Sequence, residues 1–420
     1  MTRVIKNFDA LATTPLRSDA LTIAEAAYAA IDTEVVVRSA LTLEGSVLRV
    51  GERAYDLSDF ARVRVIGFGK ASCKAMQTIE KILGRKLDGG IAIDIRPGVC
   101  EIASVIEGSH PYPSVQNVAA SEKIVEMASD RSEKDLFIVI VSGGGSSLLC
   151  YPYDECEQGV RLYEDMKQTE ATIEDMNTIR KHISGVKGGG LAAILYPATV
   201  IGLVFCDIPG EKSEEVASGP TYIDATTVAD AQALLDRFNL SGYTLKETPK
   251  DKKLFEHLYN VPVVTNKHAL LGMEHAARAL GYAVKNAGAD LYDETEFFVK
   301  RMCGVAASKT AVIAGGEPRL KVTRSGGKGG RCQYAALRAL SLIGEKDVFL
   351  AFASDGRDNS DAAGAIVDSK SSEKARACGA DVQKAFDSFD TYTFFEKMDD
   401  LLMTGPTDAN VSDLFVLLRA

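Results

Sequence analysis

Two glycine-rich segments contain residue types that bind phosphate groups in proteins. Gly67–Ser72 (GFGKAS) follows an apolar run and places Lys70 near the expected start of a helix, where a cation opposes the helix dipole. An anion bound beside Lys70 would remove that cost. The segment also resembles an incomplete dinucleotide-binding fingerprint with Ser72 at the third glycine position, although tight strand-to-helix turns use glycines as well.

The second segment, Ser142–Ser147 (SGGGSS), is the stronger candidate for a phosphate cradle. Its three glycines let the backbone approach an anion closely, and the helix expected after them would direct N–H groups and hydroxyls at it. A plain flexible turn is the alternative. The residues predicted to hold a phosphate-bearing cofactor are Gly67, Gly69, Ser142, Gly143, Gly144, Gly145, Ser146, Ser147 and Lys187.

Basic side chains gather near such segments although the chain is acidic overall. They are Arg180, Lys181, Lys187, Arg319, Lys328, Arg331 and Arg357. Arg331 ends a glycine-rich stretch and begins an expected helix, so it meets the same dipole conflict as Lys70 and could make bidentate contacts with phosphate. For Lys328, the tip of a mobile hairpin is the alternative.

Four acids follow apolar runs and are candidates for metal binding or proton transfer. They are Asp207, Glu317, Asp355 and Asp358. Nucleotide chemistry needs oxygen ligands for Mg²⁺ and often a carboxylate that orients the attacking hydroxyl. Asp207, Glu317 and Asp355 are the predicted metal ligands, although each acid is also a common turn former or helix cap. His110 lies in an expected turn and could contact a substrate, whereas the other four histidines are interpreted as structural or solvated.

The elements that must position these residues alternate between short apolar strands and helices, a pattern typical of an α/β fold with a largely parallel sheet. Strands are predicted at 63–66, 91–95, 137–141, 201–205, 261–264, 311–314 and 348–353. Five of the apolar runs end in loops rich in glycine, serine or charge. Ligands of open parallel sheets bind outside the carboxyl ends of the strands, so a cleft assembled from these loops is the first hypothesis.

Composition limits the alternatives further. The chain has 420 residues with a net charge of −10, which argues against a general nucleic-acid or anionic-membrane surface. Its longest nearly apolar run, 191–205, is 15 residues long, whereas a membrane span needs about 20. The first 20 residues lack the apolar core of a signal peptide, and eight scattered cysteines predict reduced thiols in a cytoplasmic protein.

The charged stretch between about 224 and 260 predicts the domain boundary. We expect a Rossmann-like α/β domain over 1–245 and a second α/β domain over 246–420, with the last residues packing back on the first domain as a further option.

At these motifs the sequence resembles the class II glycerate kinases, the glycerate 2-kinase family whose carboxyl-terminal part is the MOFRL domain. The similarity runs from about residue 20 to 416. It is carried by GFGKAS, EGSHPYPS, SGGGSSLL, MNTIRKHISGVKGGGLA, CDIPGEKSEEVASGPT, AGGEPRLKV, GGKGGRCQYAAL, SDGRDNSDAAGA and TGPTDANVSDL. The chain departs from the family's usual residues at Cys332, Tyr334, Asn359 and Asp408–Ala409.

The resemblance implies ATP-dependent phosphorylation of the 2-hydroxyl of D-glycerate, giving 2-phosphoglycerate and ADP, with Mg²⁺. It also implies an active site in the cleft between two α/β domains. The family's functional positions match Lys70, Asp207, Glu317 and Arg331, which are therefore the predicted catalytic residues. The expected partners are the small acid and ATP, without nucleic acid or membrane, and a homodimer is compatible with the sequence.

Three other interpretations stay open. The first is an NAD(P)-dependent hydroxypyruvate reductase, in which Asp94, at the end of the second strand, would hold a ribose. Against it, Lys70 crowds the fingerprint and no histidine has an evident acidic partner. The second is a kinase for a related small hydroxy acid, and the third is a nucleotide-responsive binding protein without turnover.

Overall fold

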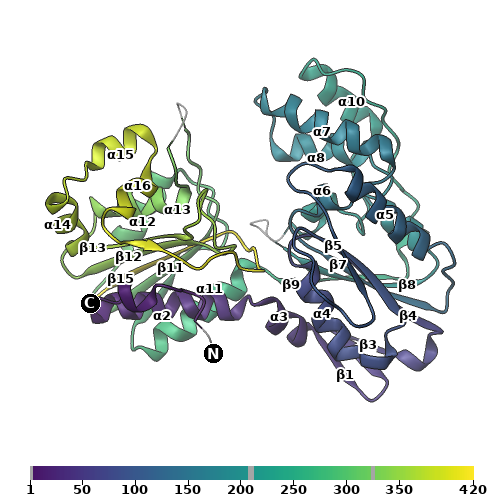
Figure 1. Ribbon diagram of the computed structural model, residues 1–420, viewed down its shortest axis with the longest axis horizontal. Helices are drawn as coiled ribbons and strands as arrows, with labels where there is room; N and C mark the ends of the chain where they lie inside the picture. The colour runs from purple at the N-terminus through teal and green to yellow at the C-terminus, as the bar shows by residue number, and fades with distance from the viewer. Residues whose placement is uncertain (1–2, 207–211, 323–326) are drawn as a thin grey trace. The chain divides into compact units, whose positions relative to one another are not determined.

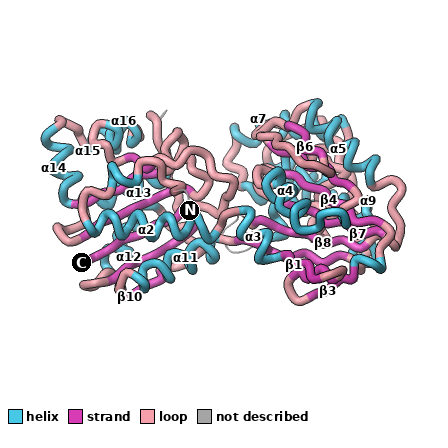
Figure 2. The backbone as a smooth tube through the Cα atoms, turned by 60° about the horizontal axis from the view of Figure 1, so that its bottom comes forward, coloured by secondary structure: helices cyan, strands magenta, loops and turns pink. Residues whose placement is uncertain are grey.

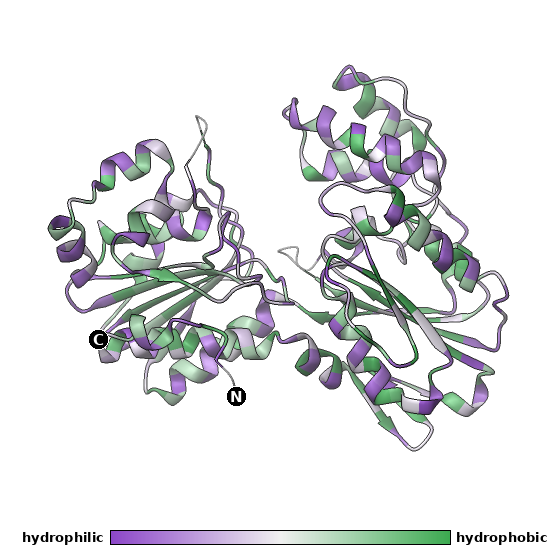
Figure 3. Ribbon diagram, viewed as in Figure 1, coloured by the Kyte–Doolittle hydropathy of each residue, from purple (hydrophilic) through white to green (hydrophobic). Residues whose placement is uncertain are grey.

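The computed structural model describes residues 3–206, 212–322 and 327–420, which form two compact units. The N-terminal unit comprises residues 33–206 and 212–263, and the C-terminal unit comprises residues 3–32 and 264–420. Each unit contains its own six-stranded sheet, so the predicted two-domain α/β architecture is confirmed. In both units the strands carry the hydrophobic colour most consistently (Figure 3).

The N-terminal unit is built on a sheet with the strand order of a Rossmann fold. Its strands are β4 (Arg62–Phe68), β5 (Gly89–Asp94), β6 (Ser104–Glu107), β7 (Asp135–Val141), β8 (Thr199–Phe205) and β9 (Leu258–Val264). They are arranged β6-β5-β4-β7-β8-β9, and the pairings from β6 through β8 are parallel. The chain order therefore reverses between β4 and β7, and ligands of such sheets bind at that point.

Helices and a small antiparallel sheet complete the N-terminal unit (Figure 1). The helices are α3 (Thr33–Ala40), α4 (Ser72–Leu83), α5 (Val115–Met127), α6 (Gly145–Leu148), α7 (Tyr153–Lys167), α8 (Ile173–His182), α9 (Gly190–Leu195) and α10 (Val228–Arg237), with 3₁₀ turns η1 (Leu57–Asp59), η2 (Gly84–Lys86), η3 (Ser213–Ser218) and η4 (Lys252–Phe255). The small sheet contains β1 (Leu41–Glu44), β2 (Val47–Val50) and β3 (Arg53–Asp56). Helix α4 forms where predicted because Ala75, Ile79 and Leu83 share one buried face, and it ends at Gly84.

The C-terminal unit has a mixed sheet. Its strands are β10 (Ala283–Asn286), β11 (Thr310–Gly316), β12 (Asp347–Ala353), β13 (Gly364–Asp368), β14 (Leu401–Leu402) and β15 (Asp413–Arg419), in the order β10-β11-β15-β12-β13-β14. Its helices are α1 (Phe8–Leu11), α2 (Pro15–Ala30), α11 (Asn266–Ala279), α12 (Thr295–Val305), α13 (Arg331–Leu340), α14 (Ser369–Ala377), α15 (Val382–Ser388) and α16 (Thr391–Glu396). The strands lie side by side in the tube view (Figure 2). Among the described strands of this sheet, only β10 and β11 form a parallel pair.

The two ends of the chain both belong to the C-terminal unit, which differs from the predicted ranges 1–245 and 246–420. Helix α2 lies beside α11 under the mixed sheet (Figure 1), and its Arg17 is fully buried between Asp368 and Asp400. The last residues belong to the mixed sheet, where β15 pairs with both β11 and β12. Such long-range pairings leave no local signal in the sequence.

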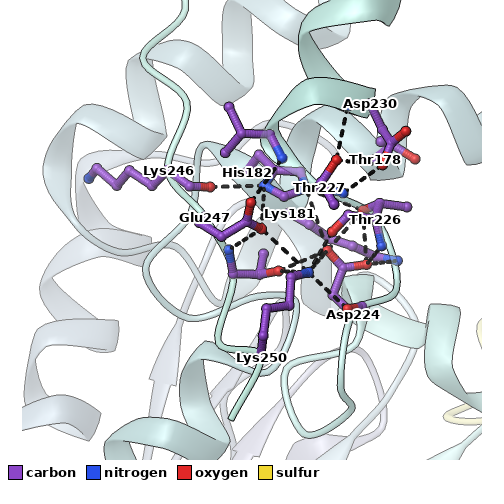
Figure 4. Close-up of polar contacts among 12 residues, drawn as sticks. Thr178, Lys181, His182, Asp224, Thr226, Thr227, Asp230, Lys246, Glu247 and Lys250 are labelled. Atoms are coloured by element: carbon purple, nitrogen blue, oxygen red, sulfur yellow. Dashed lines mark hydrogen bonds and ion pairs between the residues drawn. The ribbon is translucent and has the colours of Figure 1, made fainter.

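The charged stretch that predicted the boundary is instead part of the N-terminal unit. Its charges belong to a network around His182 and Asp224 (Figure 4). The Nδ1 atom of His182 lies 2.9 Å from the main-chain oxygen of Lys246, and the ammonium of Lys250 donates to the main-chain oxygen of Asp224 at 2.9 Å. The segment therefore has the charged composition of a linker, although its charges are paired with residues of the N-terminal unit.

The sequence predicts that no apolar run is long enough to span a membrane, and the helices of the structure can be tested for the same property. Within residues 3–206, 212–322 and 327–420, no helix has the length and apolar character needed to cross a membrane.

Candidate functional site

The strongest candidate site lies where the chain order of the N-terminal sheet reverses. The loops that follow β4 and β7 are joined there, since the N–H of Lys70 donates to the main-chain oxygen of Gly143 at 2.9 Å and the N–H of Ser142 donates to Phe68 at 3.1 Å. Gly69 has a φ of 117°, and a Cβ atom at this position would lie 2.5 Å from the main-chain oxygen of Ser142. Only glycine permits this approach, which brings the GFGKAS and SGGGSS segments together.

Two basic side chains lie over the glycine loop. A Cβ atom at Gly144 would lie 3.1 Å from Cδ2 of His110 and 3.4 Å from Cγ of Lys70. The Lys70 ammonium has no carboxylate partner among the described residues. Desolvation of the ring, then the positive charges of Lys70 and Arg180, lower the pKa of His110 to about 4, so this histidine is neutral at pH 7.

The glycine loop presents main-chain donors to the same place. The N–H groups of Gly143 and Gly144 have no acceptor in the described part of the chain. Gly144 is left-handed, with a φ of 82°, and successive free N–H groups in such turns form concavities that bind anions. The helix expected after the loop, α6, is only four residues long, so the loop itself supplies these donors.

A buried asparagine fixes the turn that carries His110. Asn117 is fully buried and donates through Nδ2 to the main-chain oxygens of Ser109 at 2.9 Å and Ser147 at 2.8 Å. The hydroxyl of Ser147 also donates to Pro111 at 2.6 Å. These bonds connect the loop after β6 to the loop after β7, so three strand ends contribute to one site.

The predicted binding residue Lys187 has another role in the structure. Its side chain is 1% exposed, is paired with the carboxylate of Glu155 and donates to the main-chain oxygen of Leu149 at 2.8 Å. Lys187 therefore stabilises the end of the SGGGSSLL segment from the protein interior. Its charge and its hydrogen bonds are satisfied there, so it does not face a ligand.

Asp94, which would hold a ribose in a reductase, caps helix α4 instead. It is 2% exposed, and its two carboxylate oxygens accept from the N–H groups of Cys73 at 2.9 Å and Arg96 at 3.2 Å. Burial raises the pKa of Asp94. The carboxylate also offsets the dipole conflict that the sequence assigned to Lys70. The structure therefore does not favour the reductase interpretation.

A second set of charged residues lies in the C-terminal unit. Nε of Arg331 donates to Asp413 at 2.8 Å and its Nη1 lies 3.3 Å from Glu317. The Arg331 and Glu317 side chains stay 39% and 40% exposed, so both can reach a ligand. Burial raises the pKa of Asp413 to about 7 against the opposing charge of Arg331, with Asp358 and Glu317 adding to the rise. Sequence reasoning missed Asp413, whose only signal is its position inside the TGPTDANVSDL motif.

Asp355 and Asp358, the two other predicted acids that the structure describes, have local structural roles. Asp358 accepts from the N–H groups of Cys332 at 3.1 Å and Gln333 at 2.7 Å, and it thereby caps helix α13. Burial raises the pKa of Asp358 to about 6 although these N–H groups oppose the rise. Asp355 accepts from the N–H of Arg357 at 2.9 Å, as a turn former does.

The predicted metal ligands are only partly described. Asp207 lies outside the described residues, and Glu317 and Asp355 are the two remaining candidates. Within residues 3–206, 212–322 and 327–420, no group of three or more histidine, cysteine, aspartate or glutamate side chains is placed to hold a metal ion. Mg²⁺ in kinases commonly needs only one or two carboxylates beside substrate phosphates and water, so the half-exposed Glu317 fits one ligand position.

A Rossmann-order sheet with a cationic glycine loop at the reversal point defines an α/β protein built to bind small anionic ligands. Residues 19–251 match a domain of unknown function, DUF4147, and residues 310–413 match the MOFRL family. A D-glycerate 2-kinase of Thermotoga maritima is 33% identical over 384 residues, 84% of this chain and 90% of that protein. The chain therefore belongs to the glycerate kinase family that combines DUF4147 and MOFRL domains, which confirms the resemblance.

Two further relatives show how the family is named. A protein of Agrobacterium vitis called a putative hydroxypyruvate reductase is 32% identical over 386 residues, covering 85% of this chain and 87% of that protein. The crystal structure of a glycerate kinase from Thermotoga maritima has a TM-score of 0.86 at 26% identity, covering 97% of this chain and all of the other. The fold similarity thus extends over both units.

Proposed function

We propose that this protein transfers the γ-phosphoryl group of ATP to the 2-hydroxyl of D-glycerate and releases 2-phosphoglycerate and ADP. The observation that carries the proposal is the Lys70 side chain, which has no carboxylate partner in the described residues and whose Cγ lies next to Gly144, where two main-chain N–H groups have no acceptor. Both substrates are anions at neutral pH. The family relationship supplies the reaction class.

Lys70 and the N–H groups of Gly143 and Gly144 are proposed to hold a phosphate or carboxylate of the substrates and to neutralise charge that develops during transfer. Phosphoryl transfer depends mainly on positioning and electrostatic stabilisation, which fixed donors of this kind supply. Arg331 is proposed to do the same from the C-terminal unit, where Asp413 and Glu317 hold its guanidinium.

The acceptor hydroxyl must lose its proton as its oxygen bonds to phosphorus and ADP leaves. Asp207 and Glu317 are the proposed carboxylates for these two roles. One would accept the proton and the other would bind the metal, in either assignment. Bound Mg²⁺ would be held through Glu317 together with Asp207 or Asp355, and it would neutralise phosphate charge. The eight cysteines, all of them free thiols, support the proposed cytoplasmic setting.

An assay with two cofactors tests the reaction class. The protein is incubated with ATP, Mg²⁺ and a panel of three- and four-carbon hydroxy acids while ADP release is followed, and separately with hydroxypyruvate and NADH. We expect ADP release that depends on D-glycerate and no NADH oxidation. NADH oxidation without ADP release would establish the reductase, and ADP release with another acid would correct the acceptor.

A further inference from the structure

Arg180 is an arginine of the N-terminal unit whose charge has no carboxylate partner. Its Nη1 donates to Oδ1 of Asn177 at 3.0 Å and its Nη2 contacts the sulfur of Met176 at 2.9 Å. No ion pair joins it to any acid of the described residues. Desolvation lowers the pKa of this half-buried arginine below its usual value, and the charge of Glu155 opposes the fall without forming an ion pair.

The acid whose charge acts on Arg180 already has other partners. Glu155 acts on Arg180 only through its charge, since one carboxylate oxygen pairs with Lys187 and the other accepts from the Ser184 hydroxyl at 2.6 Å and the N–H of Tyr151 at 2.9 Å. Charges removed from water are normally paired. An external anion would supply the direct partner that this half-buried arginine lacks.

A chain of hydrogen bonds connects Arg180 to the glycine loop. Oδ1 of Asn177, which accepts from Arg180, also accepts from the hydroxyl of Ser218 at 3.3 Å, and Ser218 lies 3.0 Å from the hydroxyl of Ser146. Ser218 is fully buried and has a φ of 61°, a conformation that costs a non-glycine residue free energy and often marks functional sites. The charge of Arg180 also acts on His110, which lies over Gly144.

The residues after Arg180 hold the end of α8 in place (Figure 4). The Lys181 ammonium lies 3.4 Å from Asp224 and 3.5 Å from Glu215, and Nε2 of His182 lies 3.2 Å from the Thr226 hydroxyl. Lys181 and His182 are thus bound on the buried side of the helix. The neighbouring Arg180 makes its side-chain hydrogen bonds only to Asn177 and Met176 among the described residues.

We infer that Arg180, held by Asn177, is a further binding residue of the Lys70 site and contacts an oxyanion of a substrate. The inference rests on the proposed function for the identity of that substrate, which offers either the carboxylate of the hydroxy acid or a phosphate of the nucleotide. A planar guanidinium can bind either group through two parallel hydrogen bonds.

Binding to purified variants tests the inference without turnover. Dissociation constants of D-glycerate, inorganic phosphate and ADP are measured by calorimetry for the wild type, R180Q and the control R38Q. Arg38 is an exposed arginine of the same unit that pairs with Glu34 one helical turn away. We expect R180Q to weaken at least one ligand tenfold or more and R38Q to change all three less than twofold.

The ligand that is lost identifies the source of the oxyanion. If only D-glycerate binding is weakened, Arg180 contacts the carboxylate of the hydroxy acid. If phosphate and ADP binding are weakened, Arg180 contacts a phosphate of the nucleotide. Wild-type affinity of folded R180Q for all three ligands overturns the inference, and so does the absence of measurable binding to the wild type.

If R180Q does not fold, R180K serves in its place, because lysine keeps the charge and lacks the planar fork. A Kd at least threefold weaker for one ligand supports the inference, and unchanged affinities overturn it. ADP release by the wild type is measured in parallel. Without turnover, a binding defect in R180Q still supports the anion site while the proposed reaction fails.

Discussion

The contact between the loops after β4 and β7 depends on the absence of a side chain at Gly69. In Gly69→Ala, the backbone would have to keep a φ of 117°, which costs an alanine about 1–3 kcal/mol. The new methyl group would also meet the main-chain oxygen of Ser142 at 2.5 Å, and such overpacking costs about 1–3 kcal/mol more. The sum is about 2–6 kcal/mol, a large fraction of the about 5–15 kcal/mol that stabilises a typical domain.

Gly45→Ala provides the matched control. Gly45 has a φ of 63° in the β1–β2 hairpin, and nothing lies within 4 Å of its missing Cβ atom, so this change tests the backbone strain without a clash. It should cost about 1–2 kcal/mol. Urea unfolding followed by circular dichroism gives both values, and calorimetry with inorganic phosphate shows whether the Lys70 site survives.

We expect Gly69→Ala to be the less stable of the two alanine variants and to bind phosphate at least tenfold more weakly than the wild type. Equal stability of Gly69→Ala and Gly45→Ala, together with unchanged phosphate binding, would refute the claim that this close approach builds the site.

Three further predictions test individual charged groups. Replacing Lys187 by Met should destabilise the protein by about 3–5 kcal/mol, because it leaves Glu155 buried and unpaired. Phosphate binding without denaturant should stay unchanged. Weaker phosphate binding at unchanged stability would instead show that Lys187 contacts the ligand. Replacing Arg17 by Met should lower the free energy of unfolding by about 3–5 kcal/mol, and a calorimetric scan that showed no loss would contradict the packing of α2 on the C-terminal unit. His110 has a folded pKa of about 4, below the ordinary 6.5, so the unfolded chain binds more protons between these values and stability falls as the pH drops from 6.5 to 4. His110→Gln should reduce the change in the free energy of unfolding between pH 6.5 and pH 4 relative to the wild type. Identical pH profiles of stability would argue against the shifted pKa.

The strands and the loop positions of the N-terminal unit were predictable because local patterns encode them. Continuous apolar runs ending in GFGKAS and SGGGSS correspond to β4 and β7. Their order in the sheet cannot be seen in a local pattern. The position of Lys70 at the reversal point therefore required the structure, as did the inclusion of α2 and β15 in the C-terminal unit.

The helix dipoles favour an anionic ligand less than the sequence suggested. Lys70 and Arg331 both precede or begin helices, but the carboxylates of Asp94 and Asp358 cap those helices, so neither cation needs an anionic ligand for that reason. Lys70 and Arg180 differ from Lys187 in that they lack a carboxylate partner among the described residues, a property of tertiary packing. Asn177 and Ser218 were missed for the same reason, because they contribute by connecting Arg180 to the loop.

Turnover of D-glycerate and ATP by the wild type, Lys70→Met and Arg331→Met tests the central claim most directly, with the phosphorylated carbon assigned by NMR. We predict 2-phosphoglycerate and ADP from the wild type and a kcat lowered by about 10²–10³ in each variant, as expected when a charge that stabilises the transition state is removed. Near-normal turnover in both folded variants, or no phosphorylated product from the wild type, would contradict the account.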